Sequence, residues 1–237
     1  MNKTSTHSIK EQASKPVHAH QRKRFAKKRR VPLALKIVLI VGVAVVALGM
    51  IFYLNAVNSQ GSSSNGSSAY PYVVANPGQG QVAPEIKLPA TNGTTFDLAA
   101  QRGKTVLLFF QEGLSCEPCW TQIKDMEANW SDFKALGITE MVSITTDPLD
   151  ALRQKVADEG ISTPLLSDQS FAVSQTYNAN DYGMMSGSTD GHTFIVVGPD
   201  GRITWRADYG GPPDYTMYVP IPTLLADMKA GLHGHAA

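Results

Sequence analysis

Residues 105–126 read T-V-L-L-F-F-Q-E-G-L-S-C-E-P-C-W-T-Q-I-K-D-M and contain both cysteines of the chain, Cys116 and Cys119. The run from Val106 to Phe110 is apolar and rich in β-branched and aromatic residues, which predicts a short strand buried on both faces. Residues 111–115 break this pattern. The two cysteines are therefore predicted to follow directly after a central strand.

A helix is predicted to begin at the cysteines, because apolar residues then recur every three or four positions. These residues are Trp120, Ile123, Met126, Trp130 and Phe133. Pro118 suits the first turn of a helix, where its missing N–H removes no hydrogen bond. A helix N-terminus stabilises an anion and lowers the pKa of a thiol. We therefore expect Cys116 to be the exposed, thiolate-prone cysteine and Cys119 to be its shielded partner about one turn further in.

Three kinds of site contain two cysteines at this spacing. Half of a zinc site needs two further ligands, but the chain has no second cysteine pair and most of its histidines lie in the tails. A purely structural disulfide would close a very small loop and restrict the unfolded chain little. A reversible redox pair is the third kind, and the order strand, C-x-x-C, helix is its expected context. We predict a redox pair, without a metal or a cofactor.

The segment before the domain divides into three predicted parts. Residues 1–32 carry ten Lys and Arg against the single acidic Glu11, so this tail is predicted to be disordered. Residues 33–54 are apolar apart from Lys36 and are long enough to cross a bilayer. Residues 55–81 carry no charge and are rich in Gly and Ser, which predicts a flexible tether.

Three uses of this N-terminal segment compete. The basic tail alone would suit a nucleic-acid arm, but the apolar stretch that follows favours a membrane segment. A cleaved signal peptide would have a shorter apolar region and an A-x-A site, which is not found after Leu54. We predict an uncleaved single-pass anchor in the cell membrane. The basic residues before it predict a cytoplasmic N-terminus and an extracytoplasmic C-terminal domain.

Residues 82–237 have a suitable length for one domain with its own core. They contain ten basic and nineteen acidic residues, a net charge of about minus nine, which argues against binding to nucleic acid. Strands are predicted at 85–88, 95–98, 140–145, 163–166, 192–197 and 203–209, and further helices at 148–159, 170–177 and 222–232. Strands alternate with helices before a hairpin and a helix close the domain, which predicts an α/β fold with a mixed central sheet flanked by helices.

Four stretches of this domain together resemble a known family. They are A-P-E-I-K-L-P-A-T-N-G-T-T-F-D-L at 83–98, R-G-K-T-V-L-L-F-F at 102–110, C-E-P-C at 116–119 and H-T-F-I-V-V-G-P-D-G-R-I at 192–203. The pattern is similar to the redoxin branch of the thioredoxin-like superfamily, which groups alkyl hydroperoxide reductase/thiol-specific antioxidant proteins with membrane-tethered thiol-disulfide oxidoreductases. The resemblance implies a thioredoxin-like fold over residues 82–230.

The chain departs from both subgroups of that branch. In a peroxiredoxin, the resemblance implies Pro and Thr or Ser at seven and three positions before the peroxidatic cysteine, where this chain has Phe109 and Gly113. It also implies an arginine just before the late strand, where residues 190–192 read D-G-H. In the tethered reductases it implies a cis-proline where this chain has His192, and an acidic residue where this chain has Gln122.

The predicted function is that of a membrane-tethered, extracytoplasmic thiol-disulfide oxidoreductase acting in cell redox homeostasis. The Cys116 thiolate attacks a disulfide and Cys119 resolves the mixed disulfide. A thiol-dependent peroxidase is the first alternative, with Cys116 as peroxidatic and Cys119 as resolving cysteine. A non-catalytic thioredoxin-like binding module is the second. Predicted partners are protein disulfides or a peroxide, and a membrane-linked thiol reductant, because the domain lies across a membrane from the cytoplasm.

Four residues besides the cysteines are candidates for tuning the site: His192, Glu117, Pro118 and Trp120. A neutral imidazole at His192 could tune the thiolate or move a proton, or His192 could face solvent at the start of its strand. Glu112 and Glu117 lie on either side of Cys116 in the sequence. They would raise the pKa of Cys116 if their carboxylates were close to it, or they could be solvated loop residues. Trp120 could line a substrate groove or pack on the sheet.

Overall fold

The computed structural model of the chain describes residues 42–43, 45–50, 69–185 and 187–233. The chain divides into two compact units, residues 1–51 and 52–237. In the first unit, the described residues are helical and their apolar side chains are exposed. None of the helices among the described residues is long and apolar enough to cross a membrane. The predicted tail, and most of the predicted span at 33–54, lie outside the described residues.

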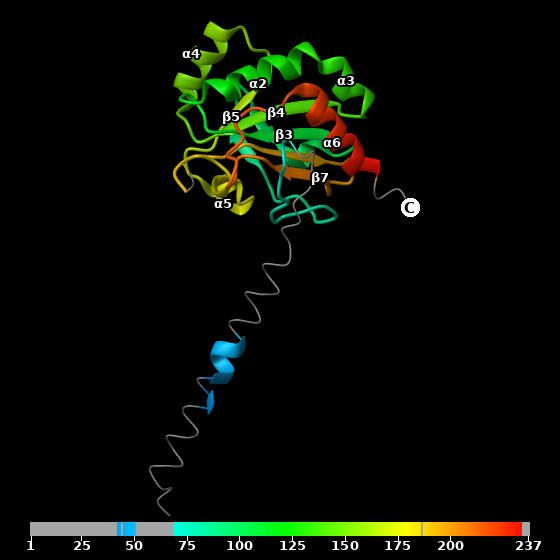
Figure 1. Ribbon diagram of the computed structural model, residues 1–237. Coiled ribbons are helices and arrows are strands. Elements are labelled where there is room, and N and C mark those ends of the chain that lie inside the picture. Colours follow the sequence, from blue (N-terminus) through cyan, green and yellow to red (C-terminus); the bar gives the residue numbers. More distant parts are fainter. Residues whose placement is uncertain (1–41, 44, 51–68, 186, 234–237) are drawn as a thin grey trace, which may run out of the picture. The chain divides into compact units, whose positions relative to one another are not determined.

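The second unit is built on a mixed sheet flanked by helices, as predicted, and this sheet has five strands (Figure 1). The strand order is β5-β4-β3-β6-β7, with β3, β4 and β5 parallel and with β6 and β7 antiparallel to their neighbours. The strands are β3 (Val106–Phe110), β4 (Glu140–Thr145), β5 (Leu165–Ser167), β6 (Thr193–Val197) and β7 (Ile203–Asp208). A separate hairpin of β1 (Lys87–Pro89) and β2 (Thr95–Asp97) turns at Gly93, which has a φ of +83°.

The central strand β3 is buried on both faces, as predicted, because helices or the hairpin cover each face of the sheet. Leu107 and Phe109 belong to a core shared with α2, α3 and α6, whereas Val106, Leu108 and Phe110 belong to a second core that contains the β1–β2 hairpin. Figure 1 shows α2, α3 and α6 on one side of the sheet and α5 on the other. The helices are α2 (Glu117–Ala128), α3 (Trp130–Ala135), α4 (Leu149–Glu159), α5 (Ala172–Thr176) and α6 (Ile221–His233), with 3-10 turns η2 (Leu98–Gln101) and η3 (Ala179–Asp181).

Two sequence predictions about this unit need correction. The helix predicted to continue past Trp130 is interrupted at Asn129, whose φ and ψ are −106° and 21° and whose side chain donates to the Asp125 carbonyl at 2.8 Å. The domain also begins before the predicted boundary at Val82. Tyr72 is 7% exposed, and Val73 exchanges backbone hydrogen bonds with Asp208 of β7. The last part of the predicted linker is therefore folded against the sheet.

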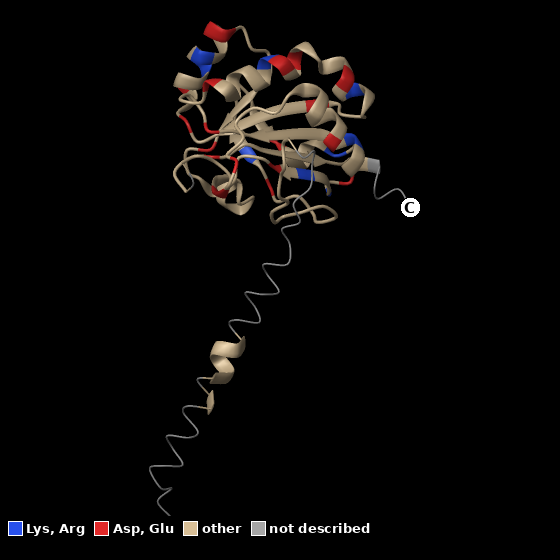
Figure 2. Cartoon of the chain, viewed as in Figure 1, with Lys and Arg blue, Asp and Glu red and all other residues tan. Residues whose placement is uncertain are grey.

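Acidic and basic residues are interleaved along α2, α3 and α4, and further acidic residues lie in the loops of the domain (Figure 2). This distribution agrees with the excess of acidic residues counted from the sequence. An acidic surface repels the phosphate backbone of nucleic acids.

Candidate active site

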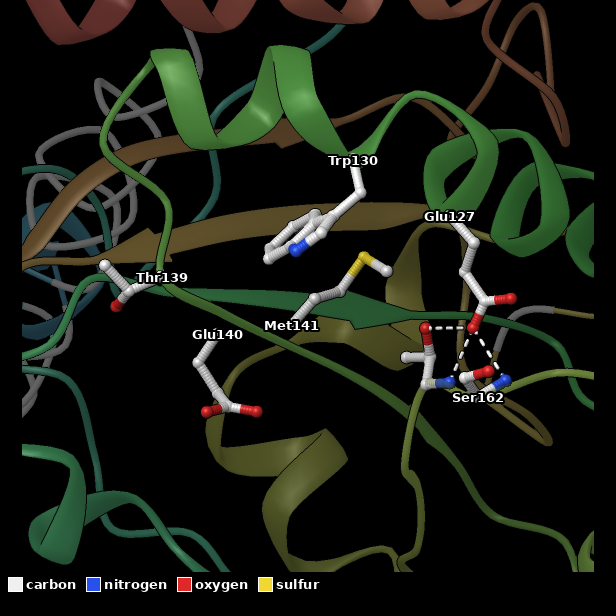
Figure 3. Close-up of a pocket in the computed structure, with 7 residues that line it drawn as sticks. Glu127, Trp130, Thr139, Glu140, Met141 and Ser162 are labelled. Atoms are coloured by element: carbon white, nitrogen blue, oxygen red, sulfur yellow. Dashed lines mark hydrogen bonds between the residues drawn. The ribbon is translucent and has the colours of Figure 1, made fainter.

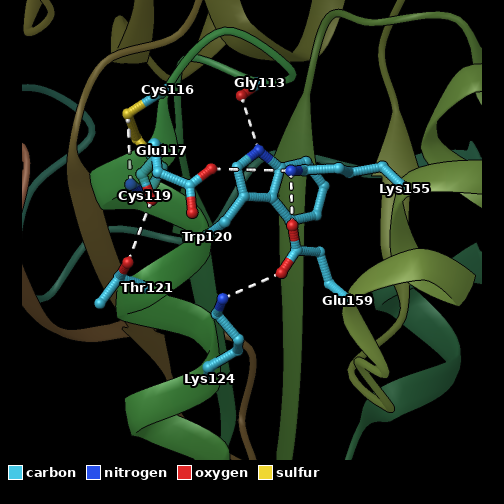
Figure 4. Close-up of polar contacts among 9 residues, drawn as sticks. All are labelled: Gly113, Cys116, Glu117, Cys119, Trp120, Thr121, Lys124, Lys155 and Glu159. Atoms are coloured by element: carbon cyan, nitrogen blue, oxygen red, sulfur yellow. Dashed lines mark hydrogen bonds and ion pairs between the residues drawn. A yellow bond between two sulfur atoms is a disulfide. The ribbon is translucent and has the colours of Figure 1, made fainter.

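The two cysteines lie after the end of β3, at the N-terminal end of α2, as the sequence predicts. Cys116 is the N-cap residue of α2, and its sulfur forms a disulfide with the sulfur of Cys119. The backbone N–H of Cys119 donates to the Cys116 carbonyl at 3.0 Å and also lies 3.3 Å from Cys116 Sγ, so an N–H of the first helical turn is shared with this sulfur (Figure 4). A thiolate at Cys116 would be stabilised by that N–H and by the helix dipole.

A tight turn before Cys116 sets the position of the disulfide. Gly113 has a φ of +90°, a left-handed conformation that favours glycine. Its carbonyl oxygen accepts hydrogen bonds from the Cys116 N–H at 3.1 Å and from the Trp120 indole N–H at 3.1 Å. The next N–H, that of Leu114, donates to the Asp147 carboxylate at 2.8 Å. Cys116 is thus held from both the strand side and the helix side.

The predicted exposure of Cys116 is wrong. Cys116 is 5% exposed and Cys119 is fully buried, and both form a small apolar cluster with Met217. Met217 lies in the loop between β7 and α6, about a hundred residues beyond the cysteines in sequence. The sequence around Met217 has no periodic pattern that would indicate this contact. The oxidised disulfide is therefore shielded by a distant loop.

His192 lies beside the disulfide and is fully buried, so the solvent-facing alternative is wrong. Its Nδ1 atom is 4.0 Å from Cys119 Sγ, and its Nε2 atom is 3.4 Å from Gln122 Oε1. Phe109 and Phe194 pack edge-on against the imidazole ring at centroid distances of 4.8 and 5.2 Å. Burial in this apolar pocket lowers the pKa of His192 to about 3, so the imidazole is neutral near pH 7.

The other candidate residues of α2 have different positions. Pro118 is exposed in the first helical turn, and Glu117 is exposed, 3.6 Å from the Lys155 ammonium. Trp120 is fully buried and belongs to the main core, so it packs on the sheet and lines no groove. Lys155 lies over the Trp120 ring at 5.3 Å. Hydrogen bonds from Lys155 and then Lys124 lower the pKa of Glu159 to about 2 (Figure 4).

Glu112 and Gln122 have roles that the sequence did not indicate. Glu112 was expected to be a solvated loop residue, but it is 6% exposed, and its carboxylate accepts hydrogen bonds from the backbone N–H groups of Met184 and Met185. Gln122 is fully buried and accepts a hydrogen bond from the Val219 N–H at 2.7 Å. Each connects the cysteine region to a loop from the C-terminal half of the domain.

A surface hollow lies near the C-terminal end of α2. It has a volume of about 360 Å³ and is lined by Glu127, Trp130, Thr139, Glu140, Met141, Ser162 and Thr163 (Figure 3). The Glu127 carboxylate is already bound by the N–H of Ser162 and by the hydroxyl of Thr163, at 2.8 and 2.7 Å. Glu127 is eight residues beyond Cys119 on the same helix, a separation of about 12 Å along the axis. The hollow is separate from the cysteine site.

Within the described residues, no group of three or more His, Cys, Asp or Glu side chains could hold a metal ion.

Residues 79–206 match the model of the AhpC/TSA family, more than half of the chain. The chain belongs to the AhpC/TSA family. A protein of Mycobacterium tuberculosis that is assigned as a peroxiredoxin is 32% identical over 127 residues, which cover 52% of this chain and 80% of that protein. The thiol-disulfide oxidoreductase ResA of Bacillus subtilis is 26% identical over 126 residues, covering 53% of this chain and 64% of ResA.

Solved structures of this family share the fold. The peroxidoxin BcpB of Mycobacterium tuberculosis superimposes with a TM-score of 0.53 at 19% identity, covering 67% of this chain and 98% of that protein. The thioredoxin-like α/β fold predicted from the sequence is thereby confirmed. As a member of the AhpC/TSA family with relatives of both kinds, the chain is an oxidoreductase.

Proposed function

We propose that this member of the AhpC/TSA family is a thiol-disulfide oxidoreductase that uses Cys116 and Cys119 as its redox pair. The observation that carries the proposal is the disulfide between these two residues at the first turn of α2. In the reduced protein, the Cys116 thiolate attacks a substrate disulfide and forms a mixed disulfide with one half of it, while the other half leaves as a thiol. Cys119 then attacks Cys116 Sγ and releases the second thiol.

The surroundings of Cys116 favour this reaction over peroxide reduction. The position that would carry Thr or Ser in a peroxiredoxin is Gly113, whose φ of +90° is unfavourable for a residue with a β-carbon. The position that would carry Pro is Phe109, which lies within β3 and stacks on Phe194 at 4.5 Å. The hydroxyl that the resemblance implies at this position in a peroxiredoxin therefore has no counterpart at Gly113.

Peroxide reduction is the second candidate, and the similarity to peroxiredoxins favours it. In that reaction Cys116 is oxidised to a sulfenic acid and the peroxide is reduced to water or an alcohol. Cys119 then displaces water from the sulfenic sulfur and forms the same disulfide. Both candidate reactions end in the oxidised state with the Cys116–Cys119 bond, and both require a thiol reductant to reopen it.

The proposal includes the membrane. The uncharged apolar stretch at 37–54, preceded by eleven basic residues of which Lys36 is the last, supports a single-pass anchor with the domain on the extracytoplasmic side. In that location the partners are protein disulfides and a membrane-linked thiol reductant. Protease treatment tests this on cells from which any outer wall or outer membrane has been removed, before and after lysis. If the proposal holds, the protease digests the domain before lysis. Protection of the domain until lysis contradicts it.

The catalytic proposal is tested with the purified full chain in detergent, reduced and then mixed with oxidised glutathione or with hydrogen peroxide. Tryptophan fluorescence follows the oxidation, and intact mass identifies its products. We expect faster oxidation by the disulfide, loss of the reaction in Cys116→Ser, and a trapped glutathione adduct in Cys119→Ser. Rapid oxidation by micromolar peroxide with slow disulfide exchange would establish the peroxidase, and inertness to both would leave a binding module.

A further inference from the structure

The orientation of the Gln122 amide determines which nitrogen of His192 carries the proton. The Val219 backbone N–H is an obligatory donor and lies 2.7 Å from the terminal Gln122 atom that also faces His192. That atom must therefore be the amide oxygen, because a nitrogen there would place two donors face to face. The same oxygen lies 3.4 Å from His192 Nε2, so Nε2 carries the N–H and donates to it.

The other ring nitrogen of His192 is then an acceptor that points at the buried cysteine. A neutral imidazole has one N–H, so Nδ1 carries a lone pair when Nε2 is protonated. Nδ1 lies 4.0 Å from Cys119 Sγ. The groups that face the ring are Cys119 and Gln122 of α2, Phe109 of β3 and Phe194 of β6, and Cys119 is the titratable group among these four.

We infer that His192 Nδ1 is the proton acceptor for the Cys119 thiol during disulfide closure. This inference deepens the proposed function and rests on it. Reduction of the disulfide gives Cys119 an S–H group, and Nδ1 is an acceptor that lies 4.0 Å from its sulfur. Gln122 is the positioning residue, because its oxygen keeps the proton on Nε2 and leaves the Nδ1 lone pair free.

The closing step conserves protons and electrons. In the mixed disulfide, Cys119 Sγ transfers its proton to His192 Nδ1 while it attacks Cys116 Sγ. The Cys116–Cys119 bond forms, the bond from Cys116 to the substrate sulfur breaks, and the leaving sulfur takes the proton. In this step Cys119 is oxidised, Cys116 stays at the disulfide level, the substrate sulfur is reduced to a thiol, and His192 returns to its neutral form.

Burial of the site explains why the proton transfer accompanies the attack. Full burial disfavours the charged imidazolium, which is why the pKa of His192 is lowered to about 3 in the oxidised protein. A thiolate formed 4 Å away attracts the imidazolium strongly in this poorly polarisable pocket. In this pocket neither the thiolate of Cys119 nor the imidazolium of His192 is favourable without the other, so the two charges form together and are neutralised together.

The test uses a coloured reagent disulfide, 5,5′-dithiobis(2-nitrobenzoate), on the reduced full chain in detergent. Attack by Cys116 releases a first thionitrobenzoate, and closure by Cys119 releases a second, so one absorbance trace reports both steps. In His192→Asn, which keeps an acceptor oxygen but no base, we expect the ratio of closure rate to attack rate to fall by about a hundredfold. Gln122→Met, which frees the tautomer, should lower the same ratio by a smaller factor.

The pH dependence separates a base from a packing residue. With a neutral imidazole available between pH 6 and 8, closure in the natural chain should change little. In His192→Asn, Cys119 loses its proton to water, so closure should accelerate by about tenfold per pH unit below the thiol pKa. His233→Asn makes the same chemical change at the last residue of α6 and should leave both the ratio and its pH profile as they are.

An unchanged ratio in His192→Asn, or the same pH profile in variant and natural chain, would overturn the inference. An equal loss in both phases would indicate a packing role and would overturn it too. His192→Phe guards against misfolding of the Asn variant, since it keeps the ring volume and also lacks the base. Failure of the proposed function looks different: oxidised glutathione leaves the natural chain reduced, whereas the reagent disulfide still reports closure.

Discussion

The indole N–H of Trp120 donates a hydrogen bond to the carbonyl oxygen of Gly113 at 3.1 Å, across the turn that carries Cys116. The Cys116 N–H donates to the same oxygen. The buried indole of Trp120 therefore holds the Gly113 carbonyl in place, and this carbonyl in turn positions Cys116. The conformation of Gly113 allows both hydrogen bonds.

Gly113→Ala should both destabilise the domain and slow the attack by Cys116. A β-carbon at Gly113 would collide with the Asp147 carboxylate and the Thr145 hydroxyl, in addition to the strain of a φ of +90°. We expect a loss of more than about 2 kcal/mol in the free energy of unfolding, since left-handed strain alone costs about 1–3 kcal/mol. Denaturant unfolding and the first thionitrobenzoate phase measure the two effects.

Gly137→Ala is the matched control for that substitution. Gly137 also has a φ of +90°, but an added β-carbon there meets no atom within 4 Å. The control should show the backbone strain alone, with normal reactivity of Cys116. Equal losses of stability and reactivity in the two variants would contradict the role assigned to the Gly113 turn.

Met217→Ala should expose the disulfide to reductants. Met217 is 8% exposed and belongs to the same small apolar cluster as the two cysteines, so its removal opens one side of the sulfur pair, and access limits the rate of thiol-disulfide exchange. We expect faster reduction by dithiothreitol, together with a loss of about 2 kcal/mol in stability for a buried Met→Ala change. Met184→Ala, at a methionine that is 66% exposed, should change neither. A reduction rate that stays the same in Met217→Ala would show that Met217 does not limit access.

Arg206→Leu should cost about 3–5 kcal/mol, because it leaves a buried carboxylate without its charged partner. Arg206 and Asp208 are both buried, and their groups lie 2.7 Å apart. Arg206 also donates to the Pro77 carbonyl at 3.1 Å, so the segment before Val82 should loosen as well. Denaturant unfolding and proteolysis of that segment measure these effects.

Arg153→Leu is the comparison for a surface pair. Arg153 contacts Asp150 at 3.0 Å, but both side chains are exposed, so we expect a change within about 1 kcal/mol. Similar costs for the buried and the exposed arginine would contradict the account of the Arg206 pair.

The stability of the oxidised chain should decrease as the pH decreases, because of His192. Burial lowers its pKa in the folded state to about 3, whereas the ordinary value is 6.5. Between these two pKa values His192 binds a proton in the unfolded state but not in the folded state. The contribution of neutral His192 to the stability is therefore fully present above pH 6.5 and is lost as the pH falls toward 3. The largest slope expected is about 1.4 kcal/mol per pH unit.

Unfolding free energies of the natural chain and of His192→Phe at pH 7.5 and at pH 5 check this dependence. The phenylalanine variant removes the titrating group, so it should lose less stability than the natural chain over this interval. A difference between the two proteins that does not vary with pH would show that His192 is not buried in its neutral form.

Sequence reasoning predicted the elements that follow from local patterns. β3 and β4 have the predicted bounds because their apolar runs are bounded by clear breaks, and α4 ends at Gly160, which has a φ of +68°. The pairing of Cys116 with Cys119 was predictable because it depends on spacing within one turn.

What the sequence did not predict depends on contacts between distant segments. Met217 covers the cysteines from the loop before α6, Glu112 is buried by the loop around Met184, and the Gln122 amide joins His192 to Val219. Burial of these side chains is a property of the packed domain, and no periodicity in their own segments indicates it. The same reason explains why Cys116 was expected to be exposed.

The backbone contact between Val73 and β7 belongs to a set of bridges at the sheet edges that affects how the chain behaves at high concentration. A sheet edge with free N–H and C=O groups is a template for pairing with another molecule. Here Val73 and Val82 bridge to Asp208 and Arg202 on one edge, and Ala90 bridges to Leu166 on the other. Both outer strands are thus partly occupied by the chain's own backbone, which disfavours edge-to-edge aggregation during redox cycling.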